Sequence, residues 1–237
     1  MKKIAGITGL CLALSVITVF WGCEKDQTQN DADYAWVRFI HSAASTGKID
    51  FSYLSLDEGV YLTAVSDAEY GNQYGYFALI PEVRTFRVYL PGTDISVAEA
   101  TLSLSLDQHY TIVATDLEVT INPSLITVED TTETAPEGKA FVRFLHASAD
   151  APDLEIQKTD GTILATNLSR YQFSSYVEIE EGTYEFSVCS SETGGQLFLS
   201  DPLTLSSGNN FTVIISGSLG SLPGPVLNAR LYQETNL

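Results

Sequence analysis

One stretch of this sequence occurs twice, and its repetition is the strongest constraint on the fold. Residues 36–45 read WVRFIHSAAS, and residues 141–150, which lie 105 positions later, read FVRFLHASAD. Later landmarks keep the same order in both halves, such as YTIVA at residues 110–114 and FTVII at residues 211–215. A period of this length predicts one structural unit of roughly 95 residues that is built twice.

Both units carry the pattern of β-strands. Apolar and polar residues alternate, Val, Ile, Thr, Tyr and Phe are frequent, and turn signals such as Asp160-Gly161 recur. A single sheet would leave one apolar face in water, so we expect an all-β chain with two tandem antiparallel β-sandwich domains of Ig-like architecture. The expected domains are residues 35–128 and 140–237. Residues 129–139, which are acidic and lack apolar periodicity, are expected to form a short exposed linker.

The N-terminus has the layout of an export signal. Two lysines precede an apolar run that ends at Trp21, and Gly22 and Cys23 follow it. Residues 20–23 (FWGC) resemble a bacterial lipobox, in which a small residue precedes a Cys that is acylated and becomes the new N-terminus. The alternative is a permanent transmembrane anchor, because a run of roughly 18 apolar residues is near the lower limit for crossing a bilayer. The acidic sequence after Cys23 favours the lipoprotein signal.

We therefore expect residues 1–22 to be a lipoprotein signal peptide, Cys23 to carry the acyl chains and residues 23–34 to form an acidic tether. The membrane contact is this lipid, and the expected location is the bacterial outer membrane, on its periplasmic face or at the cell surface. The whole chain carries a net charge of −18. Loss of the signal leaves ten basic and thirty acidic side chains, which excludes nucleic acid as the main partner.

Residues 142–153 (VRFLHASADAPD) resemble the signature of the DUF4397 domain proteins, whose first strand ends in a Val-Arg-Val-x-His-Ala-Ser-Pro-Asp-Ala-Pro-like segment. The first unit retains Val37, Arg38, His41 and Ser42 and then departs from the pattern. The resemblance extends over both units, so the chain resembles a bacterial lipoprotein with two tandem DUF4397 copies. It implies a secreted or envelope β-domain, usually repeated, with no established activity.

The repeated motif supplies five candidate structural residues, Arg38, His41, Arg143, His146 and Asp150. Each His ends an inward-facing row of its strand, where hydrogen bonds to the following loop are its expected duty. Asp150 and Asp153 could instead orient the imidazole of His146 for base or metal chemistry. Each Arg faces the opposite way and is expected to pair with a carboxylate on a neighbouring strand, an exposed contact that contributes about 0–1 kcal/mol.

The sequence assembles no recognisable metal, cofactor or catalytic set. Its three His are widely spaced, and no His-x-x-His, Cys-x-x-Cys or calcium-loop pattern occurs. Nucleophile elbows and phosphate-binding loops are missing as well. After Cys23 the one remaining thiol is Cys189, which permits no intramolecular disulfide and is expected to be inert. We therefore expect no cofactor, no metal and no enzymatic activity.

One aromatic segment is a candidate for ligand binding. Residues 69–77 (EYGNQYGYF) contain Tyr70, Tyr74 and Tyr76 beside two glycines and two amides. Flat rings beside amide donors suit stacking against a sugar face. The second unit is aromatic in the corresponding segment, residues 169–176, so shared core packing is the alternative explanation.

These observations favour a lipid-anchored, non-enzymatic envelope module that binds a glycan or a surface protein. Two alternatives stay open at this point. One is a hydrolase of extracellular polymers that uses carboxylates between the two domains. The other is a purely structural spacer of the envelope.

Replacing Cys23 by Ser removes the thiol that would be acylated. We expect the wild-type protein to enter the detergent phase in Triton X-114 partitioning and the C23S variant to move to the aqueous phase, because its acyl chains are lost. Unchanged partitioning of the variant into detergent would show that the apolar run itself anchors the chain.

Overall fold

The computed structural model describes residues 33–117, 120–220 and 224–234, all within one compact unit, Asp31–Leu237. These residues form strands and loops and contain no α-helix, which confirms the predicted all-β class. The predicted signal peptide, Cys23 and the tether up to residue 32 lie outside the described residues.

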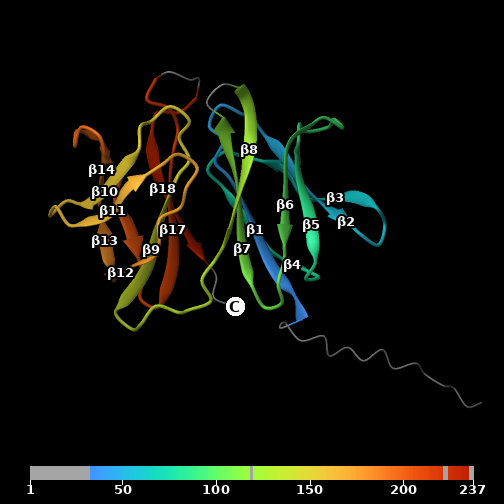
Figure 1. Cartoon of the computed structure of the whole chain (residues 1–237), viewed down its shortest axis with the longest axis horizontal. Helices are drawn as coiled ribbons and strands as arrows, with labels where there is room; N and C mark the ends of the chain where they lie inside the picture. Colours follow the sequence, from blue (N-terminus) through green and yellow to red (C-terminus); the bar gives the residue numbers. More distant parts are fainter. Residues whose placement is uncertain (1–32, 118–119, 221–223, 235–237) are drawn as a thin grey trace, which may run out of the picture. The chain divides into compact units, whose positions relative to one another are not determined.

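Two β-sandwiches follow one another along the chain, and their strands are labelled in Figure 1. The first sandwich has eight strands: β1 (Ala35–His41), β2 (Ile49–Ser55), β3 (Val60–Ala68), β4 (Gln73–Leu79), β5 (Val83–Tyr89), β6 (Ser96–Ser103), β7 (His109–Leu117) and β8 (Thr120–Glu129). The second has ten: β9 (Lys139–His146), β10 (Leu154–Lys158), β11 (Ile163–Leu168), β12 (Val177–Glu180), β13 (Gly182–Tyr184), β14 (Phe186–Ser190), β15 (Gln196–Leu199), β16 (Leu203–Leu205), β17 (Asn209–Ser216) and β18 (Asn228–Glu234).

The sheets of the two sandwiches share one strand order. The first sandwich consists of the sheet β4-β1-β7-β8 and the sheet β3-β2-β5-β6. The second consists of the sheet β12-β9-β17-β18, the sheet β11-β10-β14-β15 and the small sheet β13-β16. Neighbouring strands are antiparallel except for β1 with β7 and β9 with β17, which are parallel. The parallel pairs differ from the expected antiparallel arrangement because β1 and β7 are far apart in the chain and need no tight hairpin.

Each sandwich encloses its own apolar core, as alternation along the strands predicts. In the first, Val37 and Phe39 of β1 point inwards, and the Phe39 ring stacks on Phe51 with centroids 4.2 Å apart. In the second, Val142 and Phe144 occupy the equivalent positions on β9. This in-and-out pattern is the period of two that β-strands impose on side chains.

A third apolar cluster joins the two sandwiches. It is formed by outward-facing residues of β1 and β7 in the first sandwich and of β9, β17 and β18 in the second, with Ile40, Val113, Leu145, Ile214 and Tyr232 among its buried members. The outward faces of β1 and β9 are therefore covered by the other sandwich rather than by water. Their burial stabilises the arrangement of the two sandwiches.

Four charged side chains are buried beside this apolar contact. Arg38 lies on β1 and Arg143 at the equivalent position on β9, while Asp130 directly follows β8 and Glu234 ends β18. Their side chains are at most 2% exposed. Glu234 Oε1 lies 3.2 Å from Nη2 of each arginine, Asp130 Oδ2 lies 3.7 Å from Arg38 Nε, and Asp130 Oδ1 accepts a short hydrogen bond from Arg143. We call these four residues the ionic cluster.

Hydroxyl and carbonyl groups of both sandwiches complete the bonding around Arg38. Its Nε donates to Thr111 Oγ1 over 2.7 Å, and Thr111 Oγ1 donates in turn to Asp130 Oδ1 over 2.7 Å. Tyr76 donates its hydroxyl to Asp130 Oδ2 over 2.9 Å. Arg38 Nη1 donates to the carbonyl of Gln233, a residue of the second sandwich, over 3.0 Å.

The same arrangement is repeated around Arg143. Its Nε donates to Thr212 Oγ1 over 3.0 Å, and Thr212 Oγ1 donates to Glu234 Oε1 over 2.6 Å. Tyr176 donates to Glu234 Oε2 over 2.7 Å, and Arg143 Nη1 donates to the carbonyl of Glu129 over 3.2 Å. The ionic cluster is thus built twice, and each half reaches across to the other sandwich.

These contacts decide which groups of the cluster are charged. Burial alone would raise the pKa of the Asp130 carboxyl, but the guanidinium groups of Arg38 and Arg143 outweigh it and lower that pKa. Burial raises the pKa of the Tyr76 and Tyr176 hydroxyls, so both stay protonated and act as donors. The Asp130 carboxyl therefore stays ionised between the two arginines at neutral pH.

Two predictions from the sequence are wrong at this cluster. Arg38 and Arg143 do not form exposed ion pairs, because the other sandwich covers the strand face from which they project. Asp130 lies in the segment predicted to be an exposed linker, yet its side chain is 1% exposed. Alternation within one strand could not reveal either fact, since the covering groups belong to the other sandwich: Arg38 bonds to Thr212 and Gln233, and Asp130 bonds to Arg143.

Replacing Arg143 by Met leaves Asp130 and Glu234 buried with one cation between them. We expect the free energy of unfolding to fall by about 3–5 kcal/mol, the usual effect of removing one partner from a buried ion pair. Arg87→Met is the matched control, because its partner Glu99 is 49% exposed and such pairs contribute about 0–1 kcal/mol. Urea unfolding measures both, and equal losses in the two variants would contradict the stabilising role of the cluster.

Candidate functional site

Both motif histidines tie down the loop that follows their strand. His41 Nε2 donates to the carbonyl of Gly47 over 2.9 Å, and His146 Nε2 donates to the carbonyl of Pro152 over 2.9 Å. Each carbonyl lies six residues after its His, so the same bond forms although the two loop sequences differ. Both imidazoles are fully buried, and burial lowers the pKa of His41 and lowers that of His146 to about 4.

Asp150 does not orient His146. Its carboxylate accepts from the hydroxyl of Ser218 over 2.6 Å and from the amide of Leu219 over 2.9 Å, so it holds the loop after β17. Asp116 plays the corresponding part in the first sandwich, where it accepts from the hydroxyl of Ser45 over 2.6 Å. The motif histidines and Asp150 therefore have a structural role, which is to hold loops, and Asp150 forms no hydrogen-bonded pair with His146.

The aromatic segment 69–77 packs within the protein. Tyr76 belongs to the surroundings of the ionic cluster, and Tyr74 packs against the core of the first sandwich. Tyr70 reaches the second sandwich, where its hydroxyl lies 2.9 Å from Ser216 Oγ and Arg230 covers its ring at 4.7 Å. These contacts are the ones that the packing alternative predicts.

Gly71 allows this contact between the sandwiches. Its φ is +85°, and a Cβ at this position would lie 1.9 Å from Arg230 Nη1. A side chain at residue 71 would therefore push away the guanidinium that covers Tyr70. The glycines of the segment serve close packing here rather than loop flexibility.

The carboxylates between the sandwiches are closed to substrates. Asp130 and Glu234 are 1% and 2% exposed, and each lies within ion-pair distance of both arginines. A general acid and base must reach the scissile bond of a polymer, and these groups do not. Cys189 is also buried.

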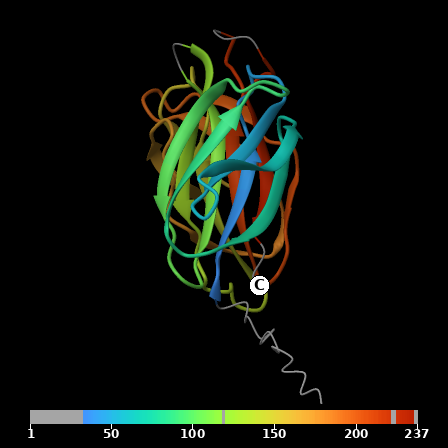
Figure 2. The ribbon, with the colours of Figure 1, turned by 90° about the vertical axis from the view of Figure 1, so that its right-hand side faces the viewer.

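A hollow of about 250 Å³ lies on the outward face of β2, β3 and β5 in the first sandwich. Figure 2 turns this sheet towards the viewer. Two tyrosines, two carboxylates and three hydroxyl residues line the hollow: Tyr61, Tyr89, Asp50, Asp94, Ser52, Thr63 and Thr93. We call it the outer hollow.

Strand pairing brings the groups of the outer hollow together. Asp50 lies opposite Tyr89 in the β2–β5 pair, and Ser52 lies opposite Thr63 in the β2–β3 pair. The rings of Tyr61 and Tyr89 meet edge to face with centroids 6.1 Å apart. Val65 of β3 points into the core, and a register shift between Phe51 and Ser52 turns Thr63 and Tyr61 to the outward face. Only the register of the sheet therefore reveals the set.

Arg87 borders the outer hollow and fixes one of its rings. Its guanidinium lies 4.2 Å from the centroid of Tyr61, a cation–π contact, and its Nε donates to Glu99 Oε2 over 2.5 Å. Burial raises the pKa of the Tyr61 hydroxyl, which therefore stays protonated at neutral pH. The hollow thus offers a ring in a fixed orientation beside carboxylate acceptors and neutral hydroxyls.

The second sandwich lacks this arrangement. Gly161 and Cys189 occupy the positions of Tyr61 and Tyr89, so the outward face there carries neither ring. Across the described parts of the chain, no three His, Cys, Asp or Glu side chains are grouped so that they could hold a metal ion. Within the same ranges no helix is long and apolar enough to cross a membrane.

A comparison with protein-family profiles shows the family to which this chain belongs. The profile of the "Domain of unknown function (DUF4397)" matches residues 35–157, more than half of the sequence. The chain belongs to the DUF4397 family. The matched region of this DUF4397 chain runs from the first residue of β1 to the penultimate residue of β10. No curated protein matches the sequence.

Solved structures resemble the DUF4397 chain only distantly. A family 26 carbohydrate-binding module of Eubacterium rectale, solved with maltoheptaose, has 10% identity and a TM-score of 0.26, with 84% of this chain and 97% of that chain covered. A candidate cell adhesion protein of Bacteroides fragilis has 8% identity and a TM-score of 0.22, with 86% and 98% covered. Likenesses at these scores do not define a shared fold.

The lowered pKa of His146 makes the stability of the DUF4397 chain depend on pH. Its folded pKa is about 4 against an ordinary value of 6.5, so the unfolded state binds a proton more readily between these values. Stability due to this residue is therefore full at pH 7 and falls as the pH drops towards 4. We expect a loss of about 2 kcal/mol between pH 7 and pH 5 from His146 alone.

Urea unfolding of the wild type and of His146→Gln at both pH values measures this effect. The variant keeps an amide donor for the carbonyl of Pro152 but cannot titrate, so its stability should change less between pH 7 and pH 5. An identical pH dependence in both proteins would contradict the buried neutral state of His146.

Proposed function

We propose that this DUF4397 chain is a lipid-anchored, non-enzymatic module of the bacterial cell envelope, built from two tandem copies of the family domain, that binds glycans. The observation that carries this proposal is the outer hollow of the first sandwich. In this hollow two aromatic rings, two carboxylates and three hydroxyl groups share one accessible concave surface.

The chemistry of the outer hollow suits a sugar. Tyrosine rings offer apolar faces to the C–H groups of a pyranose, and the carboxylates of Asp50 and Asp94 accept hydrogen bonds from its hydroxyls. The ring of Tyr61 is held by Arg87 before any ligand arrives, so little side-chain entropy is lost on binding. Because the surroundings are acidic, a neutral glycan fits better than an anionic one.

Attachment to the membrane would come from Cys23. Its acyl chains would hold the chain at the outer membrane, on the periplasmic or the cell-surface side, and residues 23–34 would serve as the tether. A domain with a net negative charge would stand away from anionic headgroups. This geometry would leave the outer hollow free to meet polymers in the surrounding medium.

The hydrolase alternative finds no support at the contact between the sandwiches. The carboxylates there, Asp130 and Glu234, are buried and form ion pairs with the two arginines of the ionic cluster. The spacer alternative would require no ligand, and the binding experiment below separates it from the glycan-binding function.

The double variant Tyr61→Ala/Tyr89→Ala removes both rings of the outer hollow. We expect glycans retained by the wild type on an array of envelope and host polysaccharides to bind the variant about tenfold more weakly or not at all, because stacking is lost. Titration calorimetry with the best-retained glycan gives the dissociation constants.

Glu155→Ala/Gln157→Ala is the matched control, because these residues stand on the second sandwich where Asp50 and Ser52 stand on the first. The control should bind like the wild type. Equal retention by wild type and Y61A/Y89A would contradict the proposed site, and retention of no glycan by the wild type would favour the spacer.

A further inference from the structure

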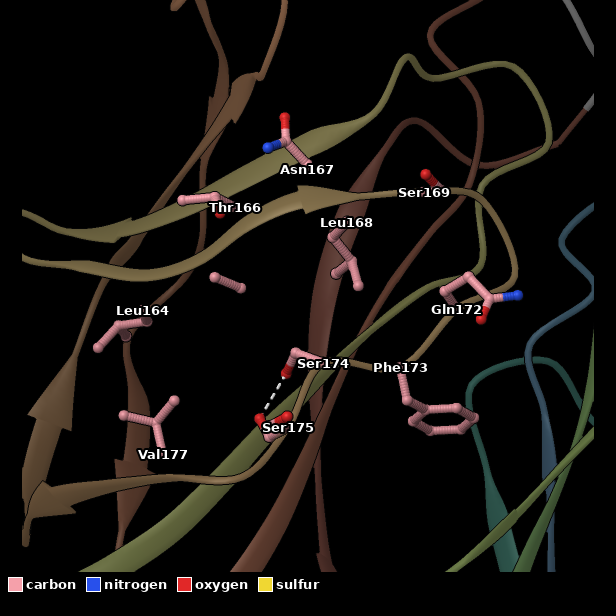
Figure 3. A pocket seen from close by; sticks show the side chains of 11 residues that line it. Leu164, Thr166, Asn167, Leu168, Ser169, Gln172, Phe173, Ser174, Ser175 and Val177 are labelled. Atoms are coloured by element: carbon pink, nitrogen blue, oxygen red, sulfur yellow. Dashed lines mark hydrogen bonds between the residues drawn. The ribbon is translucent and has the colours of Figure 1, made fainter.

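A cavity of about 350 Å³ opens in the second sandwich between β11 and the segment that leads into β12. Figure 3 shows Leu164, Leu168, Ser174 and Val177 around it, whereas the ring of Phe173 points away. The volume lies within the range of small-molecule sites, and the lining combines aliphatic side chains with hydroxyl groups. We call it the edge cavity.

The first sandwich follows a similar backbone path at this place, although Gly75 is left-handed and Ser175 is not. Residues 64–77 correspond to residues 164–177, and Asp67 and Asn167 both adopt the left-handed conformation, with φ of 53° and 49°. In both sandwiches the amide of the motif His donates to a backbone carbonyl of this segment, over 3.1 and 3.2 Å. The edge cavity can therefore be compared with its counterpart residue by residue.

A tyrosine ring occupies the counterpart in the first sandwich. Tyr74 stands where Ser174 stands in the second, and its ring packs against the core beside Ala64 and stacks at 6.4 Å from Phe39. Its hydroxyl accepts a hydrogen bond from the amide of Glu69 over 2.9 Å. The Tyr74 ring thus lies between the core residue Phe39 and the backbone amide of Glu69.

Ser174 is too small to fill this place. Its hydroxyl accepts from the amide of Phe144 over 2.9 Å and donates to the carbonyl of Ser175 over 2.8 Å, so it is held at the wall of the cavity. Leu164 and Leu168 stand where Ala64 and Ala68 stand in the first sandwich, and the edge cavity beside them measures about 350 Å³.

We infer that the edge cavity is a binding site for a phenol ring, supplied either by a free phenolic compound or by a tyrosine side chain of a peptide. The position that carries the ring of Tyr74 in the first sandwich carries Ser174 in the second, where Leu164, Leu168 and Val177 line an open cavity. A bound phenol would lie between Leu164, Leu168 and Val177, and its hydroxyl would approach the amide of Ser169, the residue that corresponds to Glu69. This site is separate from the outer hollow.

The direct test is titration of the isotope-labelled protein with p-cresol, followed by nuclear magnetic resonance. We expect saturable shifts confined to residues 164–177. In Ser174→Tyr the new side chain should occupy the cavity as Tyr74 does, and the dissociation constant for p-cresol should rise at least tenfold. Tyr74→Ser is the reciprocal variant, and it should gain a second set of saturable shifts at residues 64–77.

A second blocking variant is needed because Ser174→Tyr also removes the hydroxyl that accepts from the amide of Phe144, which could weaken binding for a different reason. Val177→Phe combined with Ser175→Gly copies the first sandwich, where the ring of Phe77 needs a glycine because a Cβ on residue 75 would lie 2.6 Å from it. This variant should also weaken p-cresol binding, whereas Y61A/Y89A should bind p-cresol like the wild type.

The source of the ring is distinguished by a parallel titration with N-acetyltyrosine amide. Binding comparable to that of p-cresol indicates a peptide tyrosine, and binding of p-cresol alone indicates a free phenol. The inference is overturned if p-cresol produces no saturable shifts, if the shifts lie outside residues 164–177, or if both blocking variants bind it unchanged.

Discussion

The ionic cluster is the interaction on which the rest of this structure depends. Two arginines and two carboxylates are buried between the sandwiches, and a charge in such a place is tolerated only when it is paired and hydrogen-bonded. Each sandwich supplies one cation and one anion, so neither can satisfy its own charges as fully when the other is absent. The cluster therefore explains why Thr111 and Thr212, whose hydroxyls bridge the ions, stand at equivalent positions in the two halves.

A comparison of the two sandwiches separates structure from binding. Residues that the halves share, such as His41 with His146 and Tyr76 with Tyr176, are used in loop anchoring or in the surroundings of the ionic cluster. The two proposed sites lie where the halves differ: the outer hollow has rings that the second sandwich lacks, and the edge cavity lacks a ring that the first sandwich has. The two halves share a frame, and the surfaces proposed to bind ligands lie at the few positions where they differ.

Much of this fold could be predicted from alternation and from the repeat, because both describe local strand geometry and inward-facing rows such as Val37 and Phe39. The duty of the motif histidines could be predicted for the same reason. The burial of Arg38 and Asp130 could not, since it depends on the surface of the other sandwich. The meeting of Tyr61 and Tyr89 could not be predicted either, because strands β3 and β5 become neighbours of β2 only through the sheet register. The segment 69–77 is a binding candidate in the sequence because of its tyrosine-rich composition alone.

The central claim is that the ionic cluster makes the two sandwiches one cooperative unit. Differential scanning calorimetry of the chain from residue 24 onwards, which lacks Cys23, tests it most directly. The account predicts a single transition whose calorimetric and van't Hoff enthalpies agree, because neither half keeps its buried charges paired alone. Two resolved transitions, or a calorimetric enthalpy near twice the van't Hoff value, would show that each sandwich unfolds by itself and would contradict the account.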